Sequence, residues 1–111
     1  MAGQRMRRVD EAVREVLSDA LGHRDLKDPR IGFVTITDVK TSTDLRHARV
    51  YVSVLGSDED REQTLAGLRS AHGVLQRRVA GELRLKRTPT LHFVYDESVE
   101  RADRLTRMME E

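Results

Sequence analysis

The sequence contains no cysteine and no tryptophan, and its 111 residues include only two prolines, two tyrosines and two phenylalanines. Without cysteine, neither a disulfide framework nor a thiolate metal site can form, so the zinc-finger classes are excluded. The four aromatic rings belong to Phe33, Tyr51, Phe93 and Tyr95. They are too few for a platform that stacks several bases of a single strand.

Long hydrophobic runs are also missing, because no apolar stretch approaches the roughly 20 residues that a membrane-spanning helix needs. Residues 1–5 lead into a patterned helix and not into the apolar segment of a signal peptide. We therefore expect a cytoplasmic protein without a membrane partner. The length fits one domain over residues 1–111, with a core at about 5–97 and a C-terminal helix at about 98–109.

Hydrophobic periodicity divides the chain into helices and strands. Apolar residues at steps of three and four predict an amphipathic helix over residues 9–21, which Gly22 ends. Strands are predicted over 31–39 and 48–55, joined by a turn at 40–45 that is short enough to favour antiparallel pairing. Ser57 is placed to cap a long central helix. A third strand at 91–95 and a final helix at 98–109 follow.

This order of helix, strand, strand, central helix, strand and short helix predicts an α+β fold. We expect a three-stranded sheet with helices packed on one face. The chain has to pass along the central helix to get from the second strand to the third. That helix is therefore expected to lie against the sheet.

The central stretch, residues 65–87, concentrates positive charge. Between positions 68 and 87 six basic residues face one acid, Glu82, although the whole chain carries only +1; they are Arg69, Arg77, Arg78, Arg84, Lys86 and Arg87. Gly73 interrupts the helical pattern at a cost of about 1 kcal/mol relative to alanine. We interpret it as a bend, or as a point where another backbone comes close. An ordinary helix that tolerates a glycine is the alternative.

Patterns typical of catalytic and metal sites are lacking. The four histidines are widely spaced, without a pair at helical ligand spacing; they are His23, His47, His72 and His92. Asp38 and Asp44 flank the predicted hairpin turn, where aspartates usually bond their own backbone. No glycine-rich phosphate loop occurs, and Ser53 lies in a strand without a nucleophile elbow. We expect no catalytic residue, no metal and no cofactor, and a protein that is not an enzyme.

Several runs, taken in order, resemble the ribosome-binding factor A family of bacterial small-subunit assembly factors. They are residues 27–32 (KDPRIG), 35–39 (TITDV), 44–56 (DLRHARVYVSVLG), 89–93 (PTLHF) and 96–98 (DES). The resemblance extends from about residue 5 to about residue 108, and it implies a type II KH-like fold. A typical KH domain clamps nucleotides with a Gly-x-x-Gly loop, which this sequence lacks. In the family this loop is replaced by an Ala-x-Gly helical kink, which Ala71, His72 and Gly73 match.

The resemblance also implies a partner and a role. The expected partner is the free small (30S) ribosomal subunit and its rRNA, bound during late maturation and rRNA processing and associated with cold adaptation. Without a clamp loop, we expect recognition of RNA phosphates by the six central basic residues, joined by Arg5, Arg7 and Arg8. The acidic C-terminal segment is expected to face away from RNA. We expect a monomer, because no excess apolar face is evident once the core is filled.

Two other functions stay open at the level of the sequence. The chain could be a protein-interaction module that docks through a sheet edge or its C-terminal helix, with the basic face incidental. It could also regulate DNA, in which case a recognition helix would enter the major groove and prefer particular sequences. Substitution of the arginines and comparison of different nucleic acids separate these alternatives.

Overall fold

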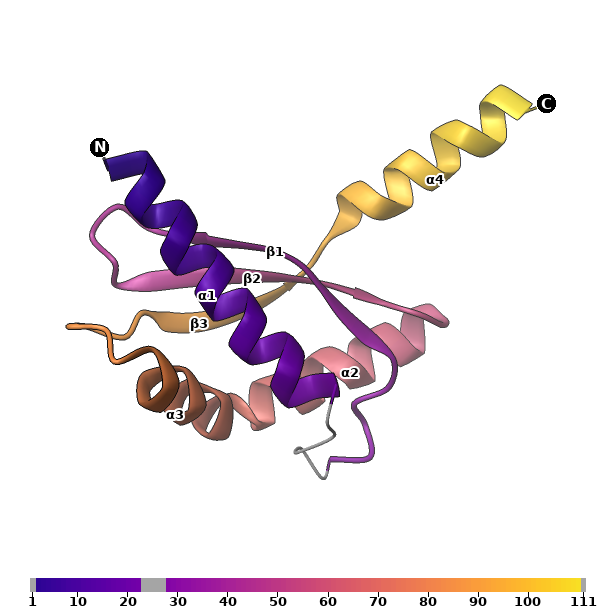
Figure 1. Ribbon diagram of the computed structural model, residues 1–111. Coiled ribbons are helices and arrows are strands. Elements are labelled where there is room, and N and C mark those ends of the chain that lie inside the picture. The colour runs from indigo at the N-terminus through magenta and orange to yellow at the C-terminus, as the bar shows by residue number, and fades with distance from the viewer. Residues whose placement is uncertain (1, 23–27, 111) are drawn as a thin grey trace.

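The computed structural model describes residues 2–22 and 28–110, except for the side chains of residues 2–4 and 99–103. Its elements, coloured along the chain in Figure 1, are helix α1 (Ala2–Gly22), strands β1 (Val34–Thr41) and β2 (His47–Val54), helices α2 (Asp58–Ser70) and α3 (His72–Leu83), strand β3 (Thr90–Tyr95) and helix α4 (Glu97–Glu110). The α+β class and the predicted order of elements are confirmed. The predicted domain ends, Met1 and Glu111, and also His23 and Lys27, lie outside the described residues.

The sheet has the order β1-β2-β3. β1 and β2 pair antiparallel as the short link predicted, and β2 and β3 pair parallel across the connection that α2 and α3 provide. The pairing of β1 with β2 contains one irregularity, between Ile36 and Asp38, which leaves Thr37 without a partner in the register. The central helices therefore connect the second strand to the third, as expected, and the structure adds that these two strands are parallel.

The first strand begins later than the sequence predicted, because Ile31 and Gly32 are held on α2, whereas the Phe33 carbonyl already accepts the Leu55 N–H at 3.1 Å. The Thr64 hydroxyl donates to the Arg30 carbonyl at 3.3 Å and accepts from the Gly32 backbone N–H at 3.4 Å. These backbone groups are thereby taken by α2 instead of by a strand. Ile31 packs partly buried against the core.

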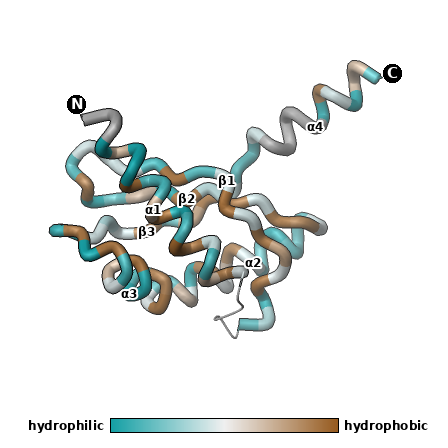
Figure 2. The backbone as a smooth tube through the Cα atoms, in the orientation of Figure 1, coloured by the Kyte–Doolittle hydropathy of each residue, from teal (hydrophilic) through white to brown (hydrophobic). Residues whose placement is uncertain are grey.

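Helices α1, α2 and α3 cover one face of the sheet (Figure 1). Apolar side chains of all three strands and of these helices meet in this layer, where brown segments face one another in Figure 2; the buried core is Val13, Val16, Leu17, Ala20, Ile36, Val39, Ala48, Val50, Val52, Leu68, Leu75, Val79, Leu91 and Phe93. Along β2 and β3, buried residues alternate with more exposed polar ones, so the opposite face of the sheet is open. The prediction that helices lie on one face is confirmed for α1–α3.

Helix α4 differs from the other helices, because it projects away from the body of the molecule (Figure 1). Leu105, Met108 and Met109 on this helix are 60%, 73% and 85% exposed. The expectation of a monomer assumed that no apolar face remains outside the core, and this premise does not hold for α4. The monomeric state therefore stays a prediction that the fold does not test.

Candidate nucleic-acid interface

The bend in the central helix lies at Ala71. Helix α2 ends at Ser70, and Ala71, with φ −83° and ψ 4°, separates it from α3. The Ala71 N–H still reaches back to the Gly67 carbonyl at 2.9 Å, and its own carbonyl accepts the Leu75 N–H at 3.0 Å. The Gly67 and Ala71 carbonyls thus keep helical partners, and the helix is interrupted at this one residue.

Gly73 is not the residue that makes this bend. It lies exposed in the first turn of α3 and has no left-handed φ, and a Cβ added there would meet only the Nη1 atom of Arg77, at 3.5 Å. Alanine therefore fits at this position in the free protein. The glycine leaves the backbone bare at the surface, and the close approach of another backbone at this point stays a prediction.

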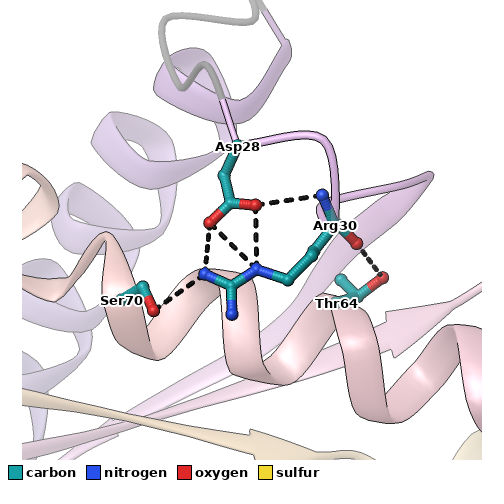
Figure 3. Close-up of polar contacts among 4 residues, drawn as sticks. All are labelled: Asp28, Arg30, Thr64 and Ser70. Atoms are coloured by element: carbon teal, nitrogen blue, oxygen red, sulfur yellow. Dashed lines mark hydrogen bonds and ion pairs between the residues drawn. The ribbon is translucent and has the colours of Figure 1, made fainter.

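A clasp of polar side chains fixes the joint to the connector before β1 (Figure 3). The Arg30 guanidinium donates to both oxygens of Asp28, at 2.6 and 3.0 Å for the shorter contacts, and to the Ser70 hydroxyl at 2.9 Å. Its hydrogen bonds lower the pKa of the Asp28 carboxyl to about 2. The last residue of α2 is thereby held against a segment that is distant in sequence.

Two of the predicted RNA-binding residues have partners within the protein. Arg78 is half-buried and forms ion pairs with Glu82 at 2.7 Å and with Asp19 of α1 at 3.4 Å. The Arg69 guanidinium donates to the Phe93 carbonyl of β3 at 3.4 Å. These contacts join helix to helix and helix to sheet, so both arginines have a structural role.

The loop between α3 and β3 carries three of the predicted residues, Arg84, Lys86 and Arg87, all exposed. Arg84 ends α3 in the left-handed conformation, with φ 48°. The Gln76 side chain of α3 then holds the far end of the loop. Its amide N–H donates to the Pro89 carbonyl at 2.7 Å, and its oxygen accepts from the Leu91 backbone N–H, at the second residue of β3, at 3.0 Å. The basic loop is therefore tied to α3 at both ends.

Tertiary structure brings this loop to the β1–β2 hairpin. The Thr90 N–H donates to the Arg46 carbonyl at 2.8 Å, which places the hairpin turn beside the start of β3. Arg46 is exposed and adds a cation that the sequence reading did not select. An exposed basic residue in a predicted hairpin turn was the available signal, but nothing in the sequence shows that this turn meets the loop before β3.

The start of α1 reaches the same end of the molecule. Asp10 accepts the Thr41 backbone N–H at 2.9 Å and also its hydroxyl, so the first half of α1 is docked on the end of β1 next to the hairpin (Figure 1). Arg5, Arg7 and Arg8 are exposed in the first turns of this helix. We name this region the basic end; its members are Arg5, Arg7, Arg8, Arg46, Arg84, Lys86 and Arg87.

Acidic residues gather at the other end. The first turn of α2 contains Asp58, Glu59 and Asp60, and Ser57 and Asp60 form the predicted capping box there. Helix α4 leaves the sheet from the same side (Figure 1), and Asp96 before it accepts hydrogen bonds from Ser98 and from Thr37 of β1, which lower the pKa of the Asp96 carboxyl. Exposed basic residues and exposed acidic residues are thus unevenly distributed along a chain of almost zero net charge.

Other site classes have little support. The described part of the chain contains no cluster of three or more side chains able to hold a metal ion, and none of its helices is long and apolar enough to cross a membrane. Asp44 accepts the Arg46 N–H at 3.0 Å and Asp38 the Val39 N–H at 2.9 Å, so both aspartates bond nearby backbone as predicted. His72 is half-buried at the first position of α3.

Comparisons with known proteins agree with one another. The family model of ribosome-binding factor A matches residues 5–109. The ribosome-binding factor A of Geobacter metallireducens is 49% identical over 108 residues, which cover 97% of this chain and 91% of the relative. The solution structure of a Thermotoga maritima protein, a candidate member of this family, matches with a TM-score of 0.73 and 37% identity, over 81% of this chain and 85% of that one.

One further match concerns a ribosomal complex. A homology model of Thermus thermophilus ribosome binding factor A, fitted into a cryo-EM map of its complex with the 30S subunit, matches with a TM-score of 0.59 and 28% identity. The match covers 78% of this chain and 93% of the other.

Proposed function

Because the chain belongs to the ribosome-binding factor A family, we propose that it binds the free small ribosomal subunit with its basic end against rRNA phosphates. The observation that carries the proposal is the meeting of α1, the hairpin turn and the loop before β3 at one end of the molecule. These segments are far apart in the sequence, and each contributes exposed arginine or lysine. Arginine suits this contact because its guanidinium can donate two hydrogen bonds to one phosphate.

The Thermus thermophilus relative, which was fitted into a map of a complex with the 30S subunit, supports this choice of partner. Electrostatics supports the orientation. The acidic residues at the start of α2 lie at the opposite end, so RNA would be attracted to one end of the protein and repelled from the other. Contact with phosphates rather than with bases fits a chain that has few aromatic rings and no Gly-x-x-Gly clamp.

The action that follows is that of a placeholder in late maturation and rRNA processing. A rigid surface that fits one rRNA conformer better than another shifts the population toward the first. Such help matters most in the cold, where alternative RNA pairings exchange slowly, which agrees with a role in cold adaptation. No step of this action needs a catalytic group or a cofactor.

The test is co-sedimentation with isolated small subunits across a salt series, with complete ribosomes and duplex DNA in parallel. The variant Lys86→Gln/Arg87→Gln removes two charges from the basic end, and Arg104→Gln on α4 is the matched control. Each phosphate contact adds about 0.9 to the slope of log K against log salt on duplex nucleic acid. We therefore expect the double variant to bind more weakly with a slope lower by about two, and the control to bind like the wild type.

The outcomes separate the proposal from its alternatives. Equal binding of the double variant and the wild type would contradict RNA contact at the basic end and would favour docking through a protein surface. Binding of duplex DNA with a preference for particular sequences would favour a DNA regulator. Equal binding to every nucleic acid would leave only a generic basic surface.

A further inference from the structure

The open face of the sheet carries a row of basic side chains that neither the sequence reading nor the interface described above includes. Lys40 of β1 is the register partner of Arg49 of β2, and Arg49 is the register partner of His92 of β3. Partners in the register point to the same face of a sheet, and all three are exposed. Lys40, Arg49 and His92 thus cross the three strands in a single row.

A second histidine completes the group. His47 lies two residues before Arg49 on β2, and its Nδ1 atom is 3.0 Å from Nε2 of His92. The two imidazole rings are tilted by 42° with their centroids 5.1 Å apart. Their separation in the sequence gave no sign of this pair, which exists because β2 and β3 run parallel side by side.

These residues line an open hollow of about 660 Å³. The Ser42 hydroxyl lies at its hairpin end, where it accepts the His47 backbone N–H at 3.1 Å. Of the described residues that line the hollow, none is acidic. Asp44 in the hairpin is engaged by the Ser42 hydroxyl at 2.6 Å and by the Arg46 N–H at 3.0 Å, and Asp10 of α1 is engaged by the Thr41 N–H at 2.9 Å.

Lys40 and Arg49 repel one another in this arrangement, although the Lys40 ammonium also lies 5.9 Å from the centre of the Tyr51 ring and helps to lower the pKa of the Asp96 carboxyl. Like charges directly opposite one another on a sheet destabilise it, and Lys40 and Arg49 are such a pair. Surface cations are normally interspersed with acids, whereas here the lining offers N–H donors from three strands and no acceptor of matching charge. A tetrahedral anion seated over the row would accept hydrogen bonds from several of these donors at once.

We propose that this hollow binds a phosphodiester group of an RNA backbone, through Arg49, Lys40 and the His47–His92 pair. The inference rests on the proposed function and adds a second contact to it. The hollow adjoins the basic end through Arg46, which directly precedes His47 on the chain. RNA would then be held on both faces of the sheet at the same end of the protein. Contacts at both the basic end and the hollow would fix the orientation of the domain on the subunit, whereas contacts at the basic end alone would not.

The experiment compares Arg49→Gln and His92→Gln with Arg104→Gln on α4, again by co-sedimentation with free small subunits across a salt series. All three side chains are exposed, so the variants should fold, and their circular dichroism is recorded first. Loss of one charge-assisted hydrogen bond to phosphate is expected to weaken binding by about tenfold in Arg49→Gln. The slope against salt should fall by about one. Arg104→Gln should match the wild type.

A direct readout follows the imidazole NMR signals of the wild type while a structured RNA or inorganic phosphate is added. The signals are assigned with His47→Gln and His92→Gln. Shifts at both imidazoles with RNA, in step with the binding curve, are the expected result. Imidazole signals that do not shift when RNA is added, or an Arg49→Gln variant that binds like the wild type, would overturn the inference. If Lys86→Gln/Arg87→Gln then still binds weakly, the proposed function survives that failure.

A third outcome concerns the source of the phosphate. If inorganic phosphate at micromolar concentration saturates the hollow while Arg49→Gln leaves subunit binding unchanged, the hollow belongs to a small phosphorylated ligand. That result would overturn the assignment to RNA. If RNA binds there and free phosphate competes only in the millimolar range, the assignment is supported.

Discussion

Replacing Gly73 with alanine should stabilise the free protein and weaken its binding to the ribosomal subunit. Gly73 has no left-handed φ, and a Cβ there would lie 3.5 Å from the tip of the flexible Arg77 side chain, an ordinary contact. Alanine therefore adopts the native backbone without strain and reduces the freedom of the unfolded chain. We expect a gain of about 0.5–1 kcal/mol in the free energy of unfolding. For a domain of this size that gain corresponds to a Tm higher by about 2–6 °C.

Gly81 supplies the matched control, because it lies in the same helix, is exposed, and has nothing within 4 Å of an added Cβ. Gly81→Ala should raise the Tm by a similar amount and leave binding unchanged. Thermal unfolding followed by circular dichroism and co-sedimentation with small subunits measure the two effects. If only Gly73→Ala loses binding, the bare backbone at Gly73 is a point where RNA comes close.

Two results would refute this reasoning. A Gly73→Ala variant that is less stable than the wild type would mean that the start of α3 needs glycine, against the geometry described. A variant that is more stable and binds normally would remove any role of Gly73 in recognition. The bend itself should persist in Gly73→Ala and in Gly81→Ala, because the bend lies at Ala71 and not at Gly73.

Three further substitutions test the framework of the site. Gln76→Ala should cost about 1–3 kcal/mol, because two backbone groups lose their partner, and should speed amide hydrogen exchange in the loop before β3. Asp28→Asn should be less stable than the wild type at neutral pH. The Arg30 hydrogen bonds lower the pKa of Asp28 in the folded state only, so the difference in stability should disappear in acid-unfolding curves as the pH falls from about 3.8 to about 2. An unchanged difference at pH 2 would contradict this assignment. Gly67→Ala should lose about 1–3 kcal/mol in urea unfolding, since its Cβ would lie 2.7 Å from Cγ1 of Ile31; a stability equal to that of the wild type would show that the connector moves freely.

Local signals were sufficient for most of the fold. Periodicity located the helices and strands, the short link gave the antiparallel hairpin, and Ser57 marked the start of α2. The error at the start of β1 had a tertiary cause. Residues 31 and 32 are suited to a strand, but Thr64 of α2 bonds the backbone on either side of Ile31 and holds these two residues on the helix.

The candidate site was predictable only in part. The charge of residues 68–87 could be read from the chain, but not the fact that Arg78 is paired with Asp19 and Glu82 while Lys86 and Arg87 are exposed in a loop. Arg46 could not be selected from the sequence, because it belongs to the basic end only through the contact of its carbonyl with the start of β3. The expectation of a fully used apolar surface failed on α4, since periodicity shows that a face is apolar but not what covers it.

The sequence by itself determined most of the helices and strands, that the central helix is interrupted close to Gly73, and that positive charge dominates its second half. These properties depend on neighbouring residues, so local pattern and propensity are enough to specify them. Only the tertiary structure decided that α1, the hairpin turn and the loop before β3 form one basic end. It also decided that Lys40, Arg49 and His92 form one row. Strand register and contacts between distant segments bring such residues together, and these contacts cannot be read from the positions of the residues along the chain.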